Sequence, residues 1–177
     1  MARHLIHERG PDVTMEDIAA ASGTSKSIVY RYFEDKSHLQ RDLGRSILQA
    51  MHDKLLEEMR VLEQRMGREP EPEERIHAMI RAYVGTAQRS PGVYRFVTRP
   101  SDGLNHFLDS VTRIVTTFLP AGTPSPQIWA TGAVGFVERA VDTWMNDLEA
   151  ADGASTTLTS DQLVTRLVTW LMKGLHS

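Results

Sequence analysis

The sequence predicts an all-α protein with a small amino-terminal helix-turn-helix unit and a larger helical domain behind it. Three observations lead to this fold class. Apolar residues recur at helical spacing along most of the 177 residues, no segment keeps the alternation of a half-buried strand, and a glycine separates two short helical runs near the amino end. A chain of this length can hold a small domain and a larger one, which we place at residues 1–45 and 46–177.

Residues 2–8 form the first predicted helix, and the next helix begins after Thr14. A threonine can cap a helix there because its hydroxyl accepts a hydrogen bond from a free backbone N–H. The predicted inward-facing positions of this helix are Ile18, Ala19 and Ala21. Ala19 is small enough for a close crossing with the following helix. Gly23 stands where a tight turn requires a positive φ.

The second run presents the surface on which the functional hypothesis depends. Thr24 or Ser25 can cap it, and its predicted inner side consists of Ile28, Val29 and either Tyr32 or Phe33. Its outer side bears short polar and cationic groups that suit base edges and phosphates, namely Ser25, Lys26, Ser27 and Arg31. The whole chain has a net charge of −3, but residues 24–41 carry four basic and two acidic side chains. Because phosphates respond to the local field, the pattern favours DNA binding.

Three short motifs lie in this region: Thr14 with Ile18–Ala19, the turn Gly23–Thr24–Ser25, and the run from Tyr30 to Lys36. Together they resemble the DNA-binding motif of the tetracycline-repressor (TetR) family of bacterial transcriptional regulators. The resemblance implies that Tyr30, Tyr32, Lys36 and Thr14 contact phosphates, although Tyr32 stands where a histidine is commoner. The predicted DNA-contacting residues are Thr14, Thr24, Ser25, Lys26, Ser27, Tyr30, Arg31, Tyr32 and Lys36. The implied function is a repressor that a small, largely apolar ligand releases from its operator.

The rest of the chain is predicted to be helical throughout. An apolar stripe from Leu39 to Met66 marks one long helix over residues 36–66, ended by Gly67. The polar segment 68–74, with two prolines, starts the next helix, which ends near residue 90. Further helices are predicted at residues 93–97, 104–118, 126–150 and 160–175. This makes about nine helices, three of them in the DNA-binding unit.

The predicted helix at residues 126–150 is apolar over too wide an arc to be covered on one side. A second subunit could cover it in a two-fold four-helix bundle that also contains residues 160–175, as in the family that the chain resembles. A homodimer would also suit two operator half-sites about 34–36 Å apart. Burial within one subunit explains the apolar pattern equally well. The predicted dimer residues are Trp129, Phe136, Ala140, Val164, Leu167, Val168 and Leu171.

A pocket for an unidentified effector is a further expectation from the resemblance. The predicted ligand-binding residues are Met79, Tyr83, Phe96, Phe107, Val111, Phe118 and Trp144. Aromatic and methionine side chains line many small-molecule sites, but they also fill ordinary cores. The long helix at residues 36–66 joins the DNA-binding unit to the core. A ligand that favours one tilt of this helix would therefore change the spacing of the two DNA-binding units.

Other classes of function find less support. The chain has no cysteine, no apolar run that could span a membrane and no signal-peptide pattern, so we expect a cytoplasmic protein without membrane contact. No enzyme motif or cofactor site is found. His4 and His7 could share a metal ion, but no third ligand is indicated, so no metal is expected. The first helix is shorter than is usual in the family. This leaves open a dimeric small-molecule or protein-binding module with weak or no DNA binding, or a native start upstream of Met1.

Overall fold

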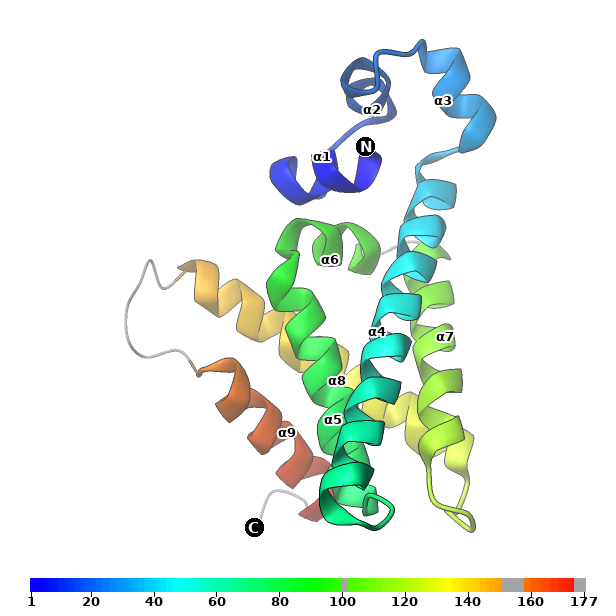
Figure 1. Ribbon diagram of the computed structural model, residues 1–177. Helices are drawn as coiled ribbons and strands as arrows, with labels where there is room; N and C mark the ends of the chain where they lie inside the picture. The colour runs from blue at the N-terminus through cyan, green and yellow to red at the C-terminus, as the bar shows by residue number, and fades with distance from the viewer. Residues whose placement is uncertain (100–101, 151–157, 174–177) are drawn as a thin grey trace.

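The computed structural model describes residues 1–99, 102–150 and 158–173. Within these ranges the chain forms nine α-helices and no strand (Figure 1), which confirms the all-α prediction. In chain order the helices are α1 (Ala2–Arg9), α2 (Met15–Ala21), α3 (Lys26–Tyr32), α4 (Lys36–Met66), α5 (Pro72–Arg89), α6 (Pro91–Thr98), α7 (Asp102–Phe118), α8 (Pro126–Ala150) and α9 (Ser160–Lys173). The predicted end of the last helix at residue 175 lies outside the described residues.

The helices α1, α2 and α3 occupy one end of the molecule (Figure 1). Thr14 and Asp17 form a capping box at the start of α2. The Asp17 N–H donates to Thr14 Oγ1 at 3.1 Å, and the Thr14 N–H donates to Asp17 Oδ2 at 2.8 Å. Gly23, with a φ of 62°, forms the turn that leads to α3. The predicted cap and the predicted glycine turn are both confirmed.

The predicted inner faces of α2 and α3 are only partly correct. Ala19 and Val29 are buried, but Ala21 is exposed, as are Ile28 at 37% and Tyr32 at 68%. Each of these helices has only seven residues and is covered from one side, so it buries few positions. Phe33, which follows α3, packs partly buried against the core. Ser25 is the N-cap residue of α3, but its hydroxyl is hydrogen-bonded to that of Ser27 at 2.8 Å and does not cap the helix.

The helix α4 connects the amino-terminal end to the body of the molecule. It begins at Asp35, whose carboxylate accepts a hydrogen bond from the His38 N–H at 2.7 Å. It ends at Gly67 in the left-handed conformation, with a φ of 63°. Between these ends it runs beside α7, and the two helices make extensive contacts (Figure 1). A single rigid element therefore reaches from the helix-turn-helix unit deep into the larger domain.

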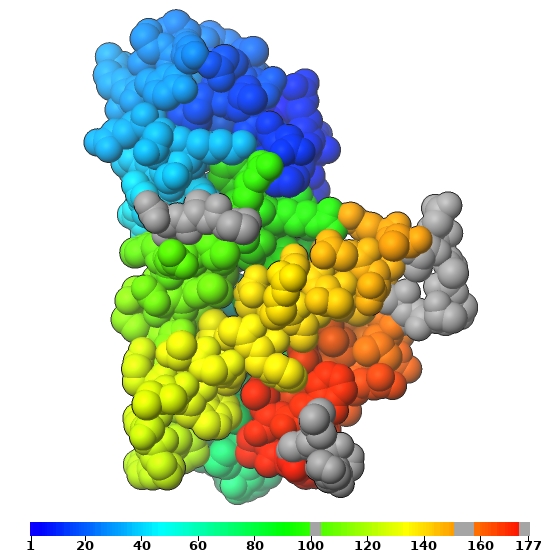
Figure 2. Space-filling view, turned by 180° about the vertical axis from the view of Figure 1, so that it is seen from behind, coloured from blue at the N-terminus to red at the C-terminus, as the bar shows by residue number. Residues whose placement is uncertain are grey.

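The other helices complete the body around α4 and α7. The helix α5 packs against α4 and α9, α8 crosses α7, and the short α6 lies between α1 and the rest of the body (Figure 1). Seen from behind, α8 and α9 form much of the surface of the carboxyl-terminal half (Figure 2). One continuous cluster of buried apolar side chains extends from Leu5 and Ile6 of α1 to Val168 of α9. None of the helices described is long and apolar enough to cross a membrane.

Candidate nucleic-acid interface and ligand cavity

The outer face of α3 is exposed at the far end of the molecule. The predicted contact residues that are exposed are Thr14, Thr24, Ser25, Lys26, Ser27, Tyr30, Arg31 and Tyr32. Val29 faces the other way and is 6% exposed, so it anchors α3 to the unit. The structure thus leaves these side chains uncovered by the rest of the described chain. An α-helix presented in this manner has the size and polarity to enter a major groove.

Lys26, on this surface, forms an ion pair with Glu16 of α2. The two groups affect each other: a hydrogen bond from Lys26 lowers the pKa of the Glu16 carboxyl, and Glu16 raises the pKa of the Lys26 ammonium. The Lys26 ammonium also lies 5.6 Å from the centre of the Tyr30 ring. Our sequence analysis missed Glu16, because only the crossing of α2 and α3 brings it to Lys26. A negative charge therefore stands beside the cation predicted to enter the groove.

Lys36 differs from the expectation of a phosphate contact. Its ammonium donates a hydrogen bond to the Pro11 carbonyl at 3.2 Å and lies 5.4 Å from the centre of the Phe96 ring. Burial lowers the pKa of this ammonium, and the nearby Arg99 guanidinium lowers it further. The side chain is half-buried because the segment between α1 and α2 lies across the start of α4. In this conformation Lys36 holds that segment and does not point outward with the α3 residues.

A set of contacts between α1, α4 and α6, which we call the α1–α6 junction, connects the two parts of the chain. Gly92 of α6 touches the backbone at the end of α1 so closely that a β-carbon would lie 2.5 Å from the Ile6 carbonyl oxygen. Arg99 donates to Asp12 Oδ1 at 3.0 Å and to the Pro11 carbonyl at 3.1 Å. The buried Gln40 amide of α4 donates to the Val97 carbonyl at 2.9 Å. The orientation of the helix-turn-helix unit therefore depends on the position of α6.

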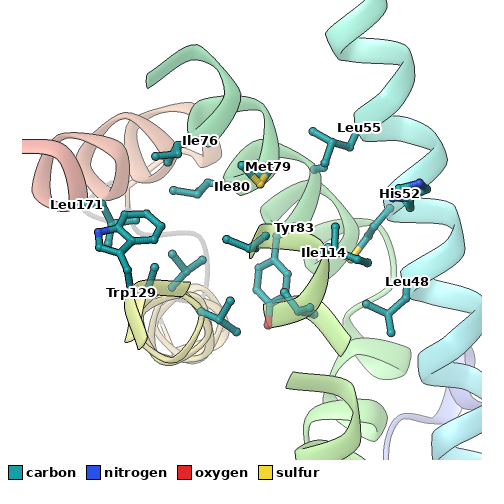
Figure 3. Close-up of a pocket in the computed structure, with 17 residues that line it drawn as sticks. Leu48, His52, Leu55, Ile76, Met79, Ile80, Tyr83, Ile114, Trp129 and Leu171 are labelled. Atoms are coloured by element: carbon teal, nitrogen blue, oxygen red, sulfur yellow. The ribbon is translucent and has the colours of Figure 1, made fainter. Parts of the chain in front are cut away.

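A cavity lies in the body between α4, α5, α7, α8 and α9 (Figure 3). The empty space is about 730 Å³, including the part that is open to solvent. Of the predicted ligand residues, Met79, Tyr83 and Val111 line it. Residues that our ligand prediction did not include complete much of the wall, among them Leu48, Met51, His52, Leu55, Ile76 and Ile80. The apolar stripe of residues 36–66 contained Met51 and Leu55, but a stripe alone does not show which of its members face a gap.

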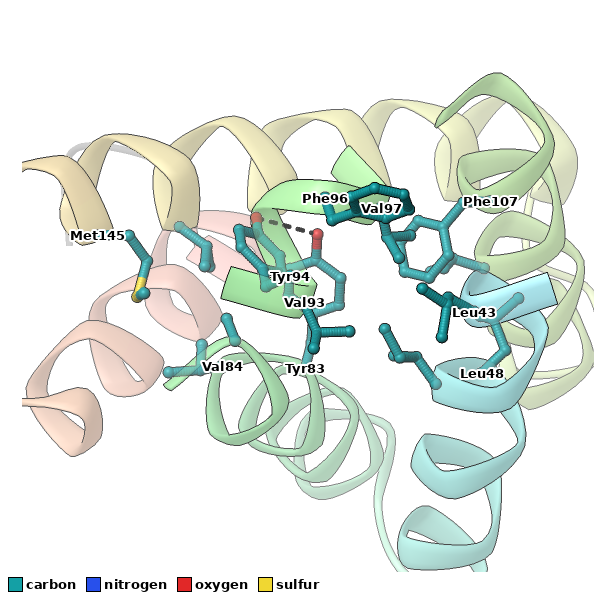
Figure 4. Close-up of a cluster of buried hydrophobic side chains, with 14 of the residues drawn as sticks. Leu43, Leu48, Tyr83, Val84, Val93, Tyr94, Phe96, Val97, Phe107 and Met145 are labelled. Atoms are coloured by element: carbon teal, nitrogen blue, oxygen red, sulfur yellow. Dashed lines mark hydrogen bonds between the residues drawn. The ribbon is translucent and has the colours of Figure 1, made fainter. Parts of the chain in front are cut away.

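The remaining predicted ligand residues lie elsewhere. Phe96, Phe107 and Trp144 are buried but are absent from the cavity wall, and Figure 4 shows Phe96 and Phe107 packed in the core with Leu43 and Val97. Phe118 packs against His52, with the ring centres 6.4 Å apart. The structure does not support the prediction that these four residues line the cavity, because each packs between helices and does not border the empty space.

Tyr83 is the residue of the cavity wall that also reaches α6. Its hydroxyl is hydrogen-bonded to the Tyr94 hydroxyl at 3.3 Å (Figure 4), and the two rings meet edge to face. Burial is the main cause that raises the pKa of both phenols, and the carboxylates of Glu138 and Asp142 raise it further. Both hydroxyl groups therefore stay protonated near neutral pH. A displaced Tyr83 ring would disturb α6 directly through Tyr94.

The predicted dimer residues fall into two groups. Phe136 is 41% exposed on α8 and meets the exposed Trp170 of α9, with the ring centres 6.2 Å apart; Ala140 lies half-buried beside them. Val164, Leu167 and Val168 are instead buried within the single chain, where α9 packs against α5. Trp129 and Leu171 line the cavity. Val164, Leu167 and Val168 thus already have partners within the subunit, whereas a dimer role for Trp129 and Leu171, both partly buried, stays a prediction.

The metal hypothesis gains no support. His4 lies 3.3 Å from Glu8, one helical turn away, in an exposed ion-pair geometry. Within the described residues, no group of three or more histidine, aspartate or glutamate side chains could hold a metal ion.

Residues 1–43 match the family described as bacterial regulatory proteins of the tetR family. This stretch contains α1, α2, α3 and the start of α4, which together carry the exposed surface described above. In this amino-terminal segment the chain is similar to regulatory proteins of the tetR family.

Two relatives of this chain are uncharacterized HTH-type transcriptional regulators of Mycobacterium tuberculosis, MT0489 of strain CDC 1551 and Rv0472c of strain H37Rv. Each is 29% identical over 154 residues, which cover 80% of this chain and 63% of the relative. The chain thus spans less than two thirds of the length of these relatives.

Two solved structures share the fold over nearly the whole chain. A TetR-family transcriptional regulator from Bordetella parapertussis 12822 superposes with a TM-score of 0.57 at 22% identity, covering 99% of this chain and 98% of that one. A protein of unknown function from Rhodococcus sp. RHA1 also has a TM-score of 0.57, at 18% identity, covering 100% of this chain and 96% of that one. The likeness in fold therefore extends over the larger domain as well as the matched amino-terminal segment.

Proposed function

We propose that this chain is a DNA-binding transcriptional regulator of the TetR family and, more specifically, a repressor that a small, largely apolar ligand releases from its operator. The observation that best supports DNA binding is the exposed outer face of α3, which carries Ser25, Ser27 and Arg31. We propose residues 1–45 as the DNA-binding domain and residues 46–177 as the ligand-binding and dimerisation domain. The continuous α4 (Lys36–Met66) crosses this boundary and links the two.

Contacts with DNA are proposed for the exposed residues of this face. Ser25, Lys26 and Ser27 would reach base edges, and Tyr30 and Tyr32 would contact phosphates. To contact DNA, Lys26 must first break its ion pair with Glu16. Since both partners of that pair are more than half exposed, the exchange costs little free energy. Lys36 is left out of the proposed contacts because it is bound to the Pro11 carbonyl.

Release by a ligand would use the cavity and the α1–α6 junction. The cavity is bordered by α4 and by Tyr83, which holds α6 through Tyr94. A ligand that fits only one arrangement of these helices would favour that arrangement. The helix-turn-helix units of a dimer would then be separated by a distance that no longer matches the half-sites. A coupling free energy of about 1–3 kcal/mol is typical of such linkage. The protein would act in the cytoplasm, by binding and not by catalysis.

DNA binding can be tested by selecting duplexes from a random-sequence library and measuring their affinity by fluorescence polarisation. The wild-type chain should enrich an inverted repeat, and its affinity should fall steeply with salt because phosphate contacts release counterions. Arg31→Gln should weaken binding and reduce the slope of log affinity against log salt by about 1. Arg60→Gln is the matched control, since Arg60 is an exposed arginine paired with Glu57 on the distal part of α4.

The same experiment separates the two candidate functions. Failure to enrich any sequence, or equal effects of Arg31→Gln and Arg60→Gln, would contradict the regulator and favour a helical module that binds small molecules or proteins without DNA. The inward position of Lys36 and the pairing of Lys26 with Glu16 are the observations in favour of that alternative.

A further inference from the structure

The walls of the cavity have a consistent chemistry. As far as the chain is described, no lysine, arginine, aspartate or glutamate lines it, and the polar side chains in its wall are His52, Tyr83 and Trp129. Figure 3 shows Leu48 and Leu55 of α4 on the side of the space opposite Trp129 of α8. An occupant would therefore be surrounded almost entirely by hydrocarbon.

The charged groups that act on the Tyr83 hydroxyl are acidic. Glu138 and Asp142 of α8 both raise the pKa of the Tyr83 and Tyr94 phenols, and burial together with Asp142 raises the pKa of the Glu138 carboxyl itself. Because no lysine or arginine among the described residues lines the cavity, an anion there would lose its hydration without gaining a cationic partner. Desolvation of an ion that remains unpaired is among the largest unfavourable contributions in a protein interior.

We infer that the cavity binds uncharged lipophiles and rejects the carboxylates of the same length. Only the role of the ligand as an effector rests on the proposed function, because binding to the cavity can be measured without DNA. It identifies the chemical class of effector as neutral alcohols, esters, ketones or hydrocarbons. Free fatty acids and other amphiphilic anions are excluded.

Three probes of equal chain length test the charge preference: 1-octanol, octanoate and octylammonium. Binding of each probe is measured by calorimetric titration of the full chain at pH 8. Octanol should bind, and octanoate should bind at least about tenfold more weakly, which corresponds to the loss of a single good interaction. Octanoate or octylammonium binding as tightly as octanol would overturn the inference, and so would octanol failing to bind.

Two variants show whether binding occurs in this cavity. Ile114→Phe adds volume to the wall and should weaken octanol binding several-fold. Leu108→Phe is the matched control, because Leu108 is a half-buried residue of the same helix that packs against the core outside the cavity. Equal weakening by both variants, or by neither, would place the bound octanol elsewhere. Thermal unfolding of each variant confirms that it is folded.

A third variant reverses the charge preference. Met79 is half-buried in the wall, and Met79→Lys would supply the missing cation on a side chain of similar length. It should improve octanoate binding relative to octanol by at least about tenfold, and an unchanged ratio would contradict the inference. The ligand titrations and the DNA-binding assay are independent, so either can give its expected result without the other. A failure of this inference can therefore be distinguished from a failure of the proposed function.

Discussion

The absence of a side chain at Gly92 allows α6 to pack closely against the end of α1. A β-carbon there would lie 2.5 Å from the Ile6 carbonyl oxygen, 3.1 Å from that of His7 and 3.2 Å from the Gly10 α-carbon. All three atoms belong to backbone at the end of α1, which cannot yield as a flexible side chain can. Only glycine allows α6 to support α1 at this distance.

We expect Gly92→Ala to lower the free energy of unfolding by about 1–3 kcal/mol, the usual cost of overpacking. Gly85→Ala is the matched control, because its β-carbon would meet only the Arg89 guanidinium at an ordinary 3.6 Å. Alanine in a helix interior normally stabilises by about 0.5–1 kcal/mol relative to glycine, so this control should be neutral or stabilised. Urea denaturation measures both; equal effects of the two substitutions would show that the close approach does not matter.

Asp17 stabilises the start of α2 through its charge. The Thr14 hydroxyl donates a hydrogen bond to its carboxylate at 2.6 Å. This bond, and next the one from the Thr14 backbone N–H, lower the pKa of the Asp17 carboxyl. The carboxylate also stands at a helix N-terminus, where a negative charge is favoured.

Folding lowers the pKa of the Asp17 carboxyl, so the ionised carboxylate stabilises the folded state. This stabilisation is fully present above the pKa that an aspartate has in the unfolded chain, about 3.9. It is lost as pH falls through the folded-state pKa. Asp17→Asn should therefore be less stable than the wild type at pH 7. The difference between the two should shrink as pH is lowered below about 4. Thermal unfolding across this pH range measures it. A difference that stays constant with pH would mean that the charge contributes nothing.

Among the helices, α4 and α6 are linked by one buried side chain. The Gln40 amide of α4 donates to the Val97 carbonyl at 2.9 Å and to the Arg99 carbonyl at 3.0 Å. These carbonyls lie at the end of α6, where a helix has no internal donors left to satisfy them. Gln40 thus closes the carboxyl end of α6 and holds it to the helix that enters the amino-terminal unit.

Gln40→Leu keeps the approximate shape but removes both donors, so we expect a loss of about 1–3 kcal/mol in the free energy of unfolding. Gln49→Leu is the control on the same helix: Gln49 is exposed and donates only to Asp53, at 2.8 Å. Its effect should stay within about 0.5 kcal/mol. A Gln40 variant as stable as the Gln49 variant would refute the proposed link between the two helices.

In the molecule as a whole, an aromatic surface on α8 and α9 is exposed. Phe136 and Trp170 meet on the outer side of α8 and α9, next to a groove whose wall includes Ala140, Thr143 and Leu163. Leu148 and Met172 of the same two helices are also exposed, at 38% and 39%. We propose that a second copy of the chain covers this surface in a two-fold homodimer, which would place two α3 faces on one duplex.

We expect Trp170→Arg to shift the chain from dimer to monomer at micromolar concentration, since aromatic side chains at interface centres contribute most of the binding energy. Val61→Arg is the control, because Val61 is also an exposed apolar residue, at 38%, but belongs to α4 and not to α8 or α9. Sedimentation velocity measures the mass of each variant. A wild-type monomer, or a dimer unaffected by Trp170→Arg, would contradict the proposed interface.

Much of the fold and part of the site could be predicted because the signals are local. A cap such as Thr14, a turn glycine such as Gly23 and a helix-ending glycine such as Gly67 each act within a single turn of backbone. The helix at residues 126–150 was predicted with the bounds that the structure has. The exposure of Ser25, Lys26 and Ser27 also followed from the helical period of α3.

Local signals could not show which partner an apolar or charged side chain would meet. Leu167 has the same pattern whether α9 packs on its own subunit or on another, and only the fold places it against α5. Lys36 turns inward because the Pro11 carbonyl comes to it from a distant segment. The cavity exists because five helices fail to fill the space between them, so its wall is a property of their packing and of no single stretch of sequence. Periodicity specifies which side of a helix is buried, whereas the identity of the covering surface depends on contacts between residues far apart in the chain.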